Sequence, residues 1–172
     1  GRVLEEGDYI GRNEIIDLVV RQPELQNSPG SKWNYCNTGF AFLAVIIERI
    51  SEQPFDVWMK ENVFDAIGME NTQVRIHRSN IIPNSAQGYV ARPGGGFREV
   101  PDISGSAGAG GIYTTVADMA LWMRNLHTGK VGGKEIIERM YTPFVLTDGE
   151  ESNYGMGLTL GEFRGLRQVS HG

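Results

Sequence analysis

Apolar residues recur every three to four positions in the first third of the chain, the spacing of a helix that buries one face. In the stretch 38–51 this face consists of Phe40, Leu43, Ile46, Ile47 and Ile50. The stretch 13–21 has the same spacing, begins at the capping residue Asn13 and ends before Pro23. The pattern therefore predicts a short amphipathic helix over 13–21 and a longer, largely buried helix over 38–51.

Three further helices are predicted from residues that start and stop helices. Pro54 suits the first turn of a helix, and Gly68 suits the position just after its last residue. Residues 115–118 resemble a capping box with aspartate in the glutamate position, and Gly129 ends that helix. A short helix is expected over 134–141.

Extended structure is expected mainly at the C-terminal end. The run 154–160 alternates in polarity as a strand does, and 165–170 is expected to begin its hairpin partner. Residues 71–111 contain prolines and two glycine clusters, so we expect a long loop with short extended pieces such as 88–90. The predicted fold class is mainly α with a few terminal antiparallel β-strands.

Composition and charge restrict the function further. With 172 residues and 40% hydrophobic content, the chain is one domain or a piece of one. The charge is −5 and no run of Lys or Arg occurs, which argues against nucleic-acid binding. No apolar stretch approaches the ~20 residues that span a bilayer. The N-terminus lacks an initiating Met and a signal-type apolar region, which indicates a cut beginning.

Neither a metal nor a nucleotide cofactor is expected. The histidines, His77, His127 and His171, are far apart in the sequence, and Cys36 is the single cysteine. The glycine clusters match neither the dinucleotide fingerprint nor a phosphate-binding loop.

The most informative segment is the turn-rich loop that leads into helix 38–51. It presents Tyr35 and Asn37 two residues apart. A tyrosine beside positive charge can move a proton, and an asparagine amide can donate to a substrate carbonyl. The alternative is structural: Tyr35 packs on the helix and Asn37 caps it. Cys36 is expected to be buried and to point away from a pocket.

Other residues are weaker candidates for pocket walls. Ser31 and Trp33 lie in the same loop, and Asp102, Ser106 and Tyr113 lie near the glycine-rich segment.

Ordered along the chain, several segments resemble the serine β-lactamase and penicillin-binding-protein superfamily, in particular its class C β-lactamases, D-alanyl-D-alanine carboxypeptidases and β-lactamase-like esterases. The matching segments are Pro29 to Gly39 with the Tyr-x-Asn motif, the helix to Ile50, Pro54 to Thr72, Ala109 to Ala120, Tyr154 to Gly157, and Ser170 to Gly172. The resemblance covers nearly all of residues 10–172.

The resemblance implies a serine hydrolase that attacks an amide or ester carbonyl through an acyl-enzyme. Tyr35 would pass protons, Asn37 would orient the substrate amide, and His171 would stand at the Lys-Thr-Gly position. Ser170 and Gly172 would bind substrate beside it. The substrate would be a small molecule or peptidoglycan-like: a β-lactam, a D-Ala peptide or a small ester. His rather than Lys weakens the case for a true β-lactamase.

One family element is missing from the sequence. No serine stands three residues before any lysine, so the Ser-x-x-Lys nucleophile is expected outside this chain, and the chain alone is expected to be inactive. A non-catalytic ligand-binding or scaffold module with the same shape is the alternative.

The same resemblance implies a partial β-lactamase/transpeptidase-like fold, with 1–172 as a fragment of one catalytic domain. Residues 10–150 would form most of the helical part, and 152–172 the first strands of the returning sheet. Without the central helix, the apolar faces of helices 38–51 and 115–127 would stay partly uncovered, which favours homo-oligomers. The compartment is unknown; the family suggests the periplasm or cell envelope.

Overall fold

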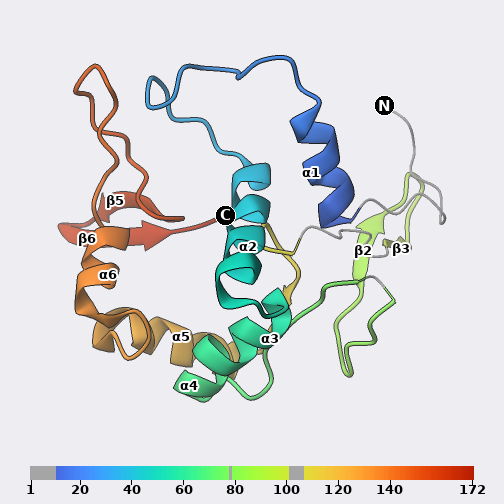
Figure 1. Ribbon diagram of the computed structural model, residues 1–172. Helices are drawn as coiled ribbons and strands as arrows, with labels where there is room; N and C mark the ends of the chain where they lie inside the picture. Colours follow the sequence, from blue (N-terminus) through green and yellow to red (C-terminus); the bar gives the residue numbers. More distant parts are fainter. Residues whose placement is uncertain (1–10, 78, 101–106) are drawn as a thin grey trace.

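The computed structural model describes residues 11–77, 79–100 and 107–172, and Figure 1 shows how their elements are arranged. The helices are α1 (Arg12–Val20), α2 (Asn37–Ser51), α3 (Phe55–Met59), the π-helix η1 (Lys60–Phe64), α4 (Asp65–Ile67), α5 (Val116–Thr128) and α6 (Gly133–Met140). The strands are β1 (Gln73–Val74), β2 (Gly88–Ala91), β3 (Phe97–Val100), β4 (Ile112–Tyr113), β5 (Thr159–Phe163) and β6 (Leu166–Ser170).

Helix α2 stands at the centre of the arrangement (Figure 1). The β5–β6 hairpin and α6 lie on one side of it, and α1 with the β2–β3 hairpin lies on the other. Helices α3, α4 and α5 lie beneath. No helix in the described part of the chain has both the length and the apolar content needed to cross a membrane.

The hydrophobic core lies where α2 meets the α3–η1–α4 segment. Its buried residues are Ala44, Phe55, Val63, Phe64, Ile67, Met69, Val74 and Ala107. Gly108 lets the backbone approach α2 closely, because a Cβ added there would lie 2.7 Å from both the Ala44 side chain and a main-chain oxygen of α2. The core therefore packs against the side of α2 that carries Ala44.

The helices begin and end near the predicted positions, but the burial of α2 was predicted wrongly. Only Ala41 and Ala44 of this helix are buried. Leu43, Ile46 and Ile50 are exposed, and Ile50 reaches 80%. Helix α5 also has an exposed apolar face, with Val116, Met119 and Met123.

The start of α5 confirms half of the predicted capping box. The Thr115 side chain accepts a hydrogen bond of 3.2 Å from the backbone N–H of Asp118. The Asp118 carboxylate does not complete the box; it is buried and accepts from the backbone of Asn71 at 2.8 Å and from the Thr72 hydroxyl at 2.7 Å. Asp118 therefore ties α5 to the segment before β1.

The strands are not confined to the C-terminal end. The extended piece expected at 88–90 is confirmed as part of β2, which forms a hairpin with β3. β1 also pairs with β4, so residues 71–113 contain more paired strand than expected. The C-terminal hairpin of β5 with β6 is confirmed, but β5 begins at Thr159 and not at Tyr154. Residues 154–158 form a turn because Gly157 has φ +82°, a conformation that interrupts a strand.

Candidate functional site

Two of the residues singled out in the sequence, Tyr35 and His171, meet in the structure although 136 positions separate them. The Tyr35 hydroxyl lies 3.4 Å from Nε2 of His171, and their ring centroids are 5.7 Å apart. Tyr35 lies two residues before α2, and His171 directly follows β6. The pairing therefore depends on the hairpin bringing the chain end back to the start of α2 (Figure 1).

The main chain fixes which imidazole nitrogen carries the proton. Nδ1 of His171 lies 2.7 Å from the carbonyl oxygen of Gly157. A carbonyl only accepts, so Nδ1 donates, and in the neutral ring Nε2 is left as an acceptor. The Tyr35 O–H then donates to Nε2, and a proton can pass between phenol and imidazole along this contact.

The other site residues predicted from the sequence lie within two positions of Tyr35 or His171 along the chain. Asn37 is the first residue of α2 and is exposed. Ser170 is the last residue of β6, opposite Thr159, and Gly172 is exposed at the chain end. Cys36 is exposed, so the expectation that it is buried was wrong.

Sequence reasoning missed Tyr154, because residues 154–160 were assigned to a strand. The Tyr154 ring packs edge-on against Tyr35, with centroids 6.4 Å apart, and at 5.2 Å against Trp33. The Phe40 ring also packs against Tyr35, with centroids 5.9 Å apart. The paired glycines at 155 and 157 were the available signal for a turn that presents Tyr154.

The Tyr154 hydroxyl is buried and has no hydrogen-bond partner within the residues that the structure describes. Burial raises the pKa of the Tyr154 phenol above its ordinary value of 10.0, and the neighbouring Tyr35 adds to that rise. Tyr154 therefore stays neutral at physiological pH.

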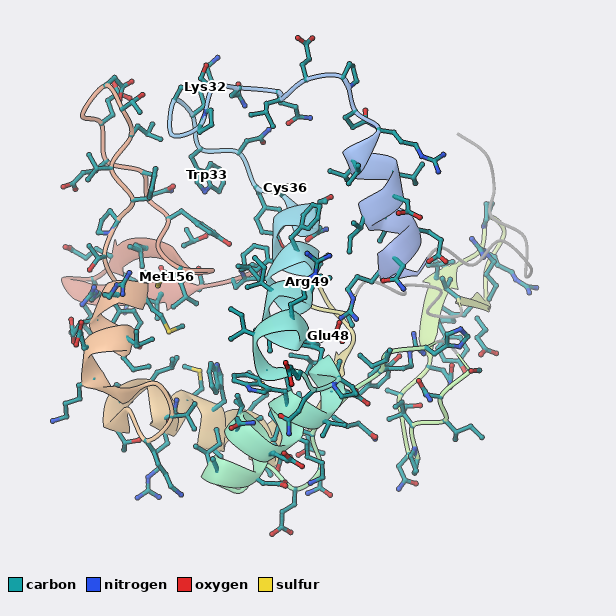
Figure 2. All side chains as sticks on the ribbon, viewed as in Figure 1. Lys32, Trp33, Cys36, Glu48, Arg49 and Met156 are labelled. Atoms are coloured by element: carbon teal, nitrogen blue, oxygen red, sulfur yellow. The ribbon has the colours of Figure 1, made fainter. Side chains whose placement is uncertain are left out.

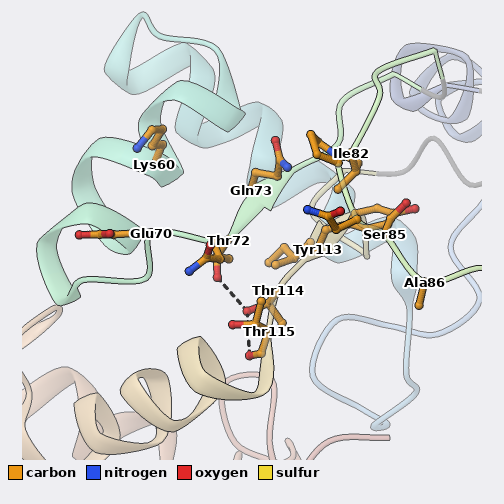
Figure 3. A pocket seen from close by; sticks show the side chains of 14 residues that line it. Lys60, Glu70, Thr72, Gln73, Ile82, Ser85, Ala86, Tyr113, Thr114 and Thr115 are labelled. Atoms are coloured by element: carbon orange, nitrogen blue, oxygen red, sulfur yellow. Dashed lines mark hydrogen bonds between the residues drawn. The ribbon is translucent and has the colours of Figure 1, made fainter.

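A separate cavity of about 800 Å³ lies between η1, the 82–86 loop and β4, and Tyr113, expected near a pocket, is one of its walls (Figure 3). Tyr35, Asn37 and His171 are not among its lining residues. Three of its polar side chains already have partners: the Thr72 and Thr114 hydroxyls lie 2.8 Å apart, and Lys60 pairs with Asp65 at 2.6 Å. The Tyr35–His171 pair is therefore the better candidate for chemistry.

Asp102 and Ser106 lie outside the described residues. Within the described ranges, no group of three or more His, Cys, Asp or Glu residues is arranged to hold a metal ion.

Comparisons with known proteins identify similar chains. The family model Beta-lactamase matches residues 6–172. A D-aminopeptidase of Gluconobacter oxydans (strain 621H) is 24% identical over 164 residues, which are 95% of this chain and 31% of that protein. The chain thus spans about a third of the length of the curated relatives it matches.

Solved structures share the arrangement. The octameric penicillin-binding protein homologue from Pyrococcus abyssi has a TM-score of 0.79 at 25% identity, covering 92% of this chain and 37% of that one. A D-amino acid amidase from Ochrobactrum anthropi SV3 has a TM-score of 0.75 at 24% identity, covering 94% and 49%. The described elements thus form part of a penicillin-binding-protein-like fold.

Proposed function

Since the Beta-lactamase model matches residues 6–172, the chain belongs to the beta-lactamase family, and we propose that it supplies the proton-transfer half of a serine hydrolase. The complete protein would cleave an amide or ester bond by forming a covalent acyl-enzyme. The observation that carries the proposal is the Tyr35 hydroxyl facing Nε2 of His171, whose Nδ1 is fixed by the Gly157 carbonyl.

In this proposal Tyr35 and His171 first take up a proton from the serine and later deliver a proton to the leaving group. As the serine oxygen attacks the carbonyl carbon, its proton passes to the Tyr35 oxygen, whose own proton has moved to Nε2 of His171. The proton then returns through Tyr35 to the leaving amine or alcohol as the carbonyl bond to it breaks. Asn37 would orient the substrate amide, and Ser170 and Gly172 would bind substrate beside the pair.

In this proposal the nucleophile comes from outside these 172 residues, since no Ser-x-x-Lys occurs among them. We therefore expect the 172-residue chain alone to form no covalent adduct with a labelled penicillin when its intact mass is measured. An adduct would contradict this expectation. It would also place a nucleophile among residues 1–172.

The test of the function uses the full-length protein with Tyr35→Phe and His171→Gln. The substrates are nitrocefin, p-nitrophenyl acetate, a D-Ala-D-Ala peptide and a D-amino acid amide, the last because of the relatives named D-aminopeptidase and D-amino acid amidase. Loss of a proton-transfer group typically lowers kcat by about 10² to 10⁴. Tyr89→Phe, an exposed tyrosine of β2, is the matched control and should keep wild-type kcat.

Full kcat in Tyr35→Phe would refute the catalytic assignment. A wild-type protein that binds these compounds reversibly and turns none over would support the non-catalytic module instead.

Self-association is the second part of the proposal. The exposed apolar faces of α2 and α5 favour contact between copies, and the octameric homologue from Pyrococcus abyssi has a similar fold. Sedimentation equilibrium of this chain should give a mass that rises with concentration. Leu43→Glu combined with Ile46→Glu should restore the monomer mass, and a monodisperse wild-type monomer would contradict the idea.

A further inference from the structure

Trp33 stands beside the Tyr35–His171 pair with much of its ring uncovered. Residues 32–36 form neither helix nor strand, and Cys36 has the extended dihedrals φ −144° and ψ 105°. Side chains two positions apart in extended backbone lie on the same side. Trp33 and Tyr35 accordingly both contact the Tyr154 ring, at 5.2 Å and 6.4 Å between centroids.

The Tyr154 ring packs against one side of Trp33. The Tyr154 backbone is held through its carbonyl, which accepts from the Phe144 N–H at 3.0 Å and from the Ser152 hydroxyl at 3.0 Å. The Trp33 and Tyr154 rings meet at an interplanar angle of 46°. One side of the indole is thus fixed, while 46% of Trp33 remains exposed.

An aromatic surface fixed in this way is suited to bind an apolar group. Ligand sites are lined mainly by apolar and aromatic side chains with a few polar groups that orient the ligand. Figure 2 shows Trp33 and Met156 on the β5–β6 side of α2, and the Met156 side chain is also exposed. Here the polar groups are those of Tyr35 and His171, and the apolar surface is that of Trp33.

We propose that Trp33 is a specificity-determining residue that binds an aromatic or large apolar group attached to the carbonyl under attack. This inference rests on the proposed hydrolase function. Two residues of extended chain span about 7 Å, a distance that a large substrate side chain can bridge between Tyr35 and Trp33. Substrates with a phenyl group there are expected to react faster than substrates with a methyl group.

The experiment compares p-nitrophenyl phenylacetate with p-nitrophenyl acetate on the full-length protein. The readout is the ratio of the two kcat/KM values, which a general loss of stability does not change. In Trp33→Ala this ratio should fall about tenfold, the effect expected for losing one aromatic contact. Trp33→Phe should retain most of the wild-type ratio, because it keeps a ring on Tyr154.

Phe97→Ala is the matched control, because Phe97 is an aromatic residue of β3 that is 71% exposed and far from the pair in sequence. It should leave both kcat/KM values unchanged. If Trp33→Ala does not fold, Trp33→Leu carries the test, and it should also lower the ratio.

The possible failures can be told apart. A wild-type protein that hydrolyses both esters, with the same ratio in Trp33→Ala or Trp33→Leu, overturns the role of Trp33 and leaves the hydrolase function standing. A wild-type protein that hydrolyses neither ester, and none of nitrocefin, the D-Ala-D-Ala peptide and the D-amino acid amide, overturns the function and this inference with it. One that hydrolyses only these other compounds overturns the inference and leaves the function standing.

Discussion

Replacing Tyr154 with phenylalanine should stabilise the protein, which is unusual for a change at a half-buried tyrosine. The substitution removes one oxygen atom and keeps the ring that packs on Trp33 and Tyr35. That oxygen is buried without a hydrogen-bond partner among the described residues. A buried polar group left unpaired costs about 1 to 3 kcal/mol, so Tyr154→Phe should raise the free energy of unfolding by roughly that amount.

Urea unfolding measures the effect, with the midpoint and the slope fitted separately so that a change in the denatured state is recognised. Tyr141→Phe is the matched control, because the Tyr141 hydroxyl donates to the Leu126 carbonyl at 3.4 Å. The same chemical change should there lower stability by about 0.5 to 1.5 kcal/mol. A loss of stability in Tyr154→Phe equal to that in Tyr141→Phe would show that the Tyr154 hydroxyl has a partner, and would refute the reasoning.

The pH dependence gives a second readout of the same group. Burial raises the pKa of Tyr154 in the folded protein, so the unfolded chain loses this proton first as the pH rises. The contribution of the neutral phenol to stability is therefore complete below pH 10.0 and is lost as the pH rises through the folded-state pKa. Wild-type stability should fall more steeply than that of Tyr154→Phe above pH 10.0, and parallel curves would contradict the assigned cause.

Two further predictions concern the contacts that hold α2 and α5. Gly108→Ala should lower the free energy of unfolding by at least about 2 kcal/mol, because the residue has φ +103° and an added Cβ would lie 2.7 Å from atoms of α2. Gly110→Ala, with nothing within 4 Å of its added Cβ, should change it by less than about 0.5 kcal/mol, and equal effects in thermal unfolding would contradict this contact. Asp118→Ala should cost about 2 to 4 kcal/mol, because it leaves the Asn71 N–H and the Thr72 hydroxyl without their charged acceptor. A thermal midpoint within 1 °C of wild type, where about 2 to 4 °C per kcal/mol is expected, would argue against it.

Local chemistry made the helix ends predictable. Thr115 caps α5 through its own side chain, and Gly129 ends that helix in a left-handed conformation, as each residue type favours. The Asp118 carboxylate was predicted wrongly because its partners come from the segment before β1, 46 and 47 positions away. Alternation of polarity likewise suggested a strand at 154–160, whereas the positive φ of Gly157 makes a turn.

The sequence by itself determined where the helices lie and that Tyr35 and Asn37 stand at the start of α2, because capping and periodicity are properties of neighbouring residues. Only the tertiary structure decided that His171 faces Tyr35 and that Tyr154 packs against Trp33. These relations join residues separated by up to 136 positions, and the packing of the β5–β6 hairpin beside α2 sets them. The spacing of residues along the chain does not predict which distant residues come into contact.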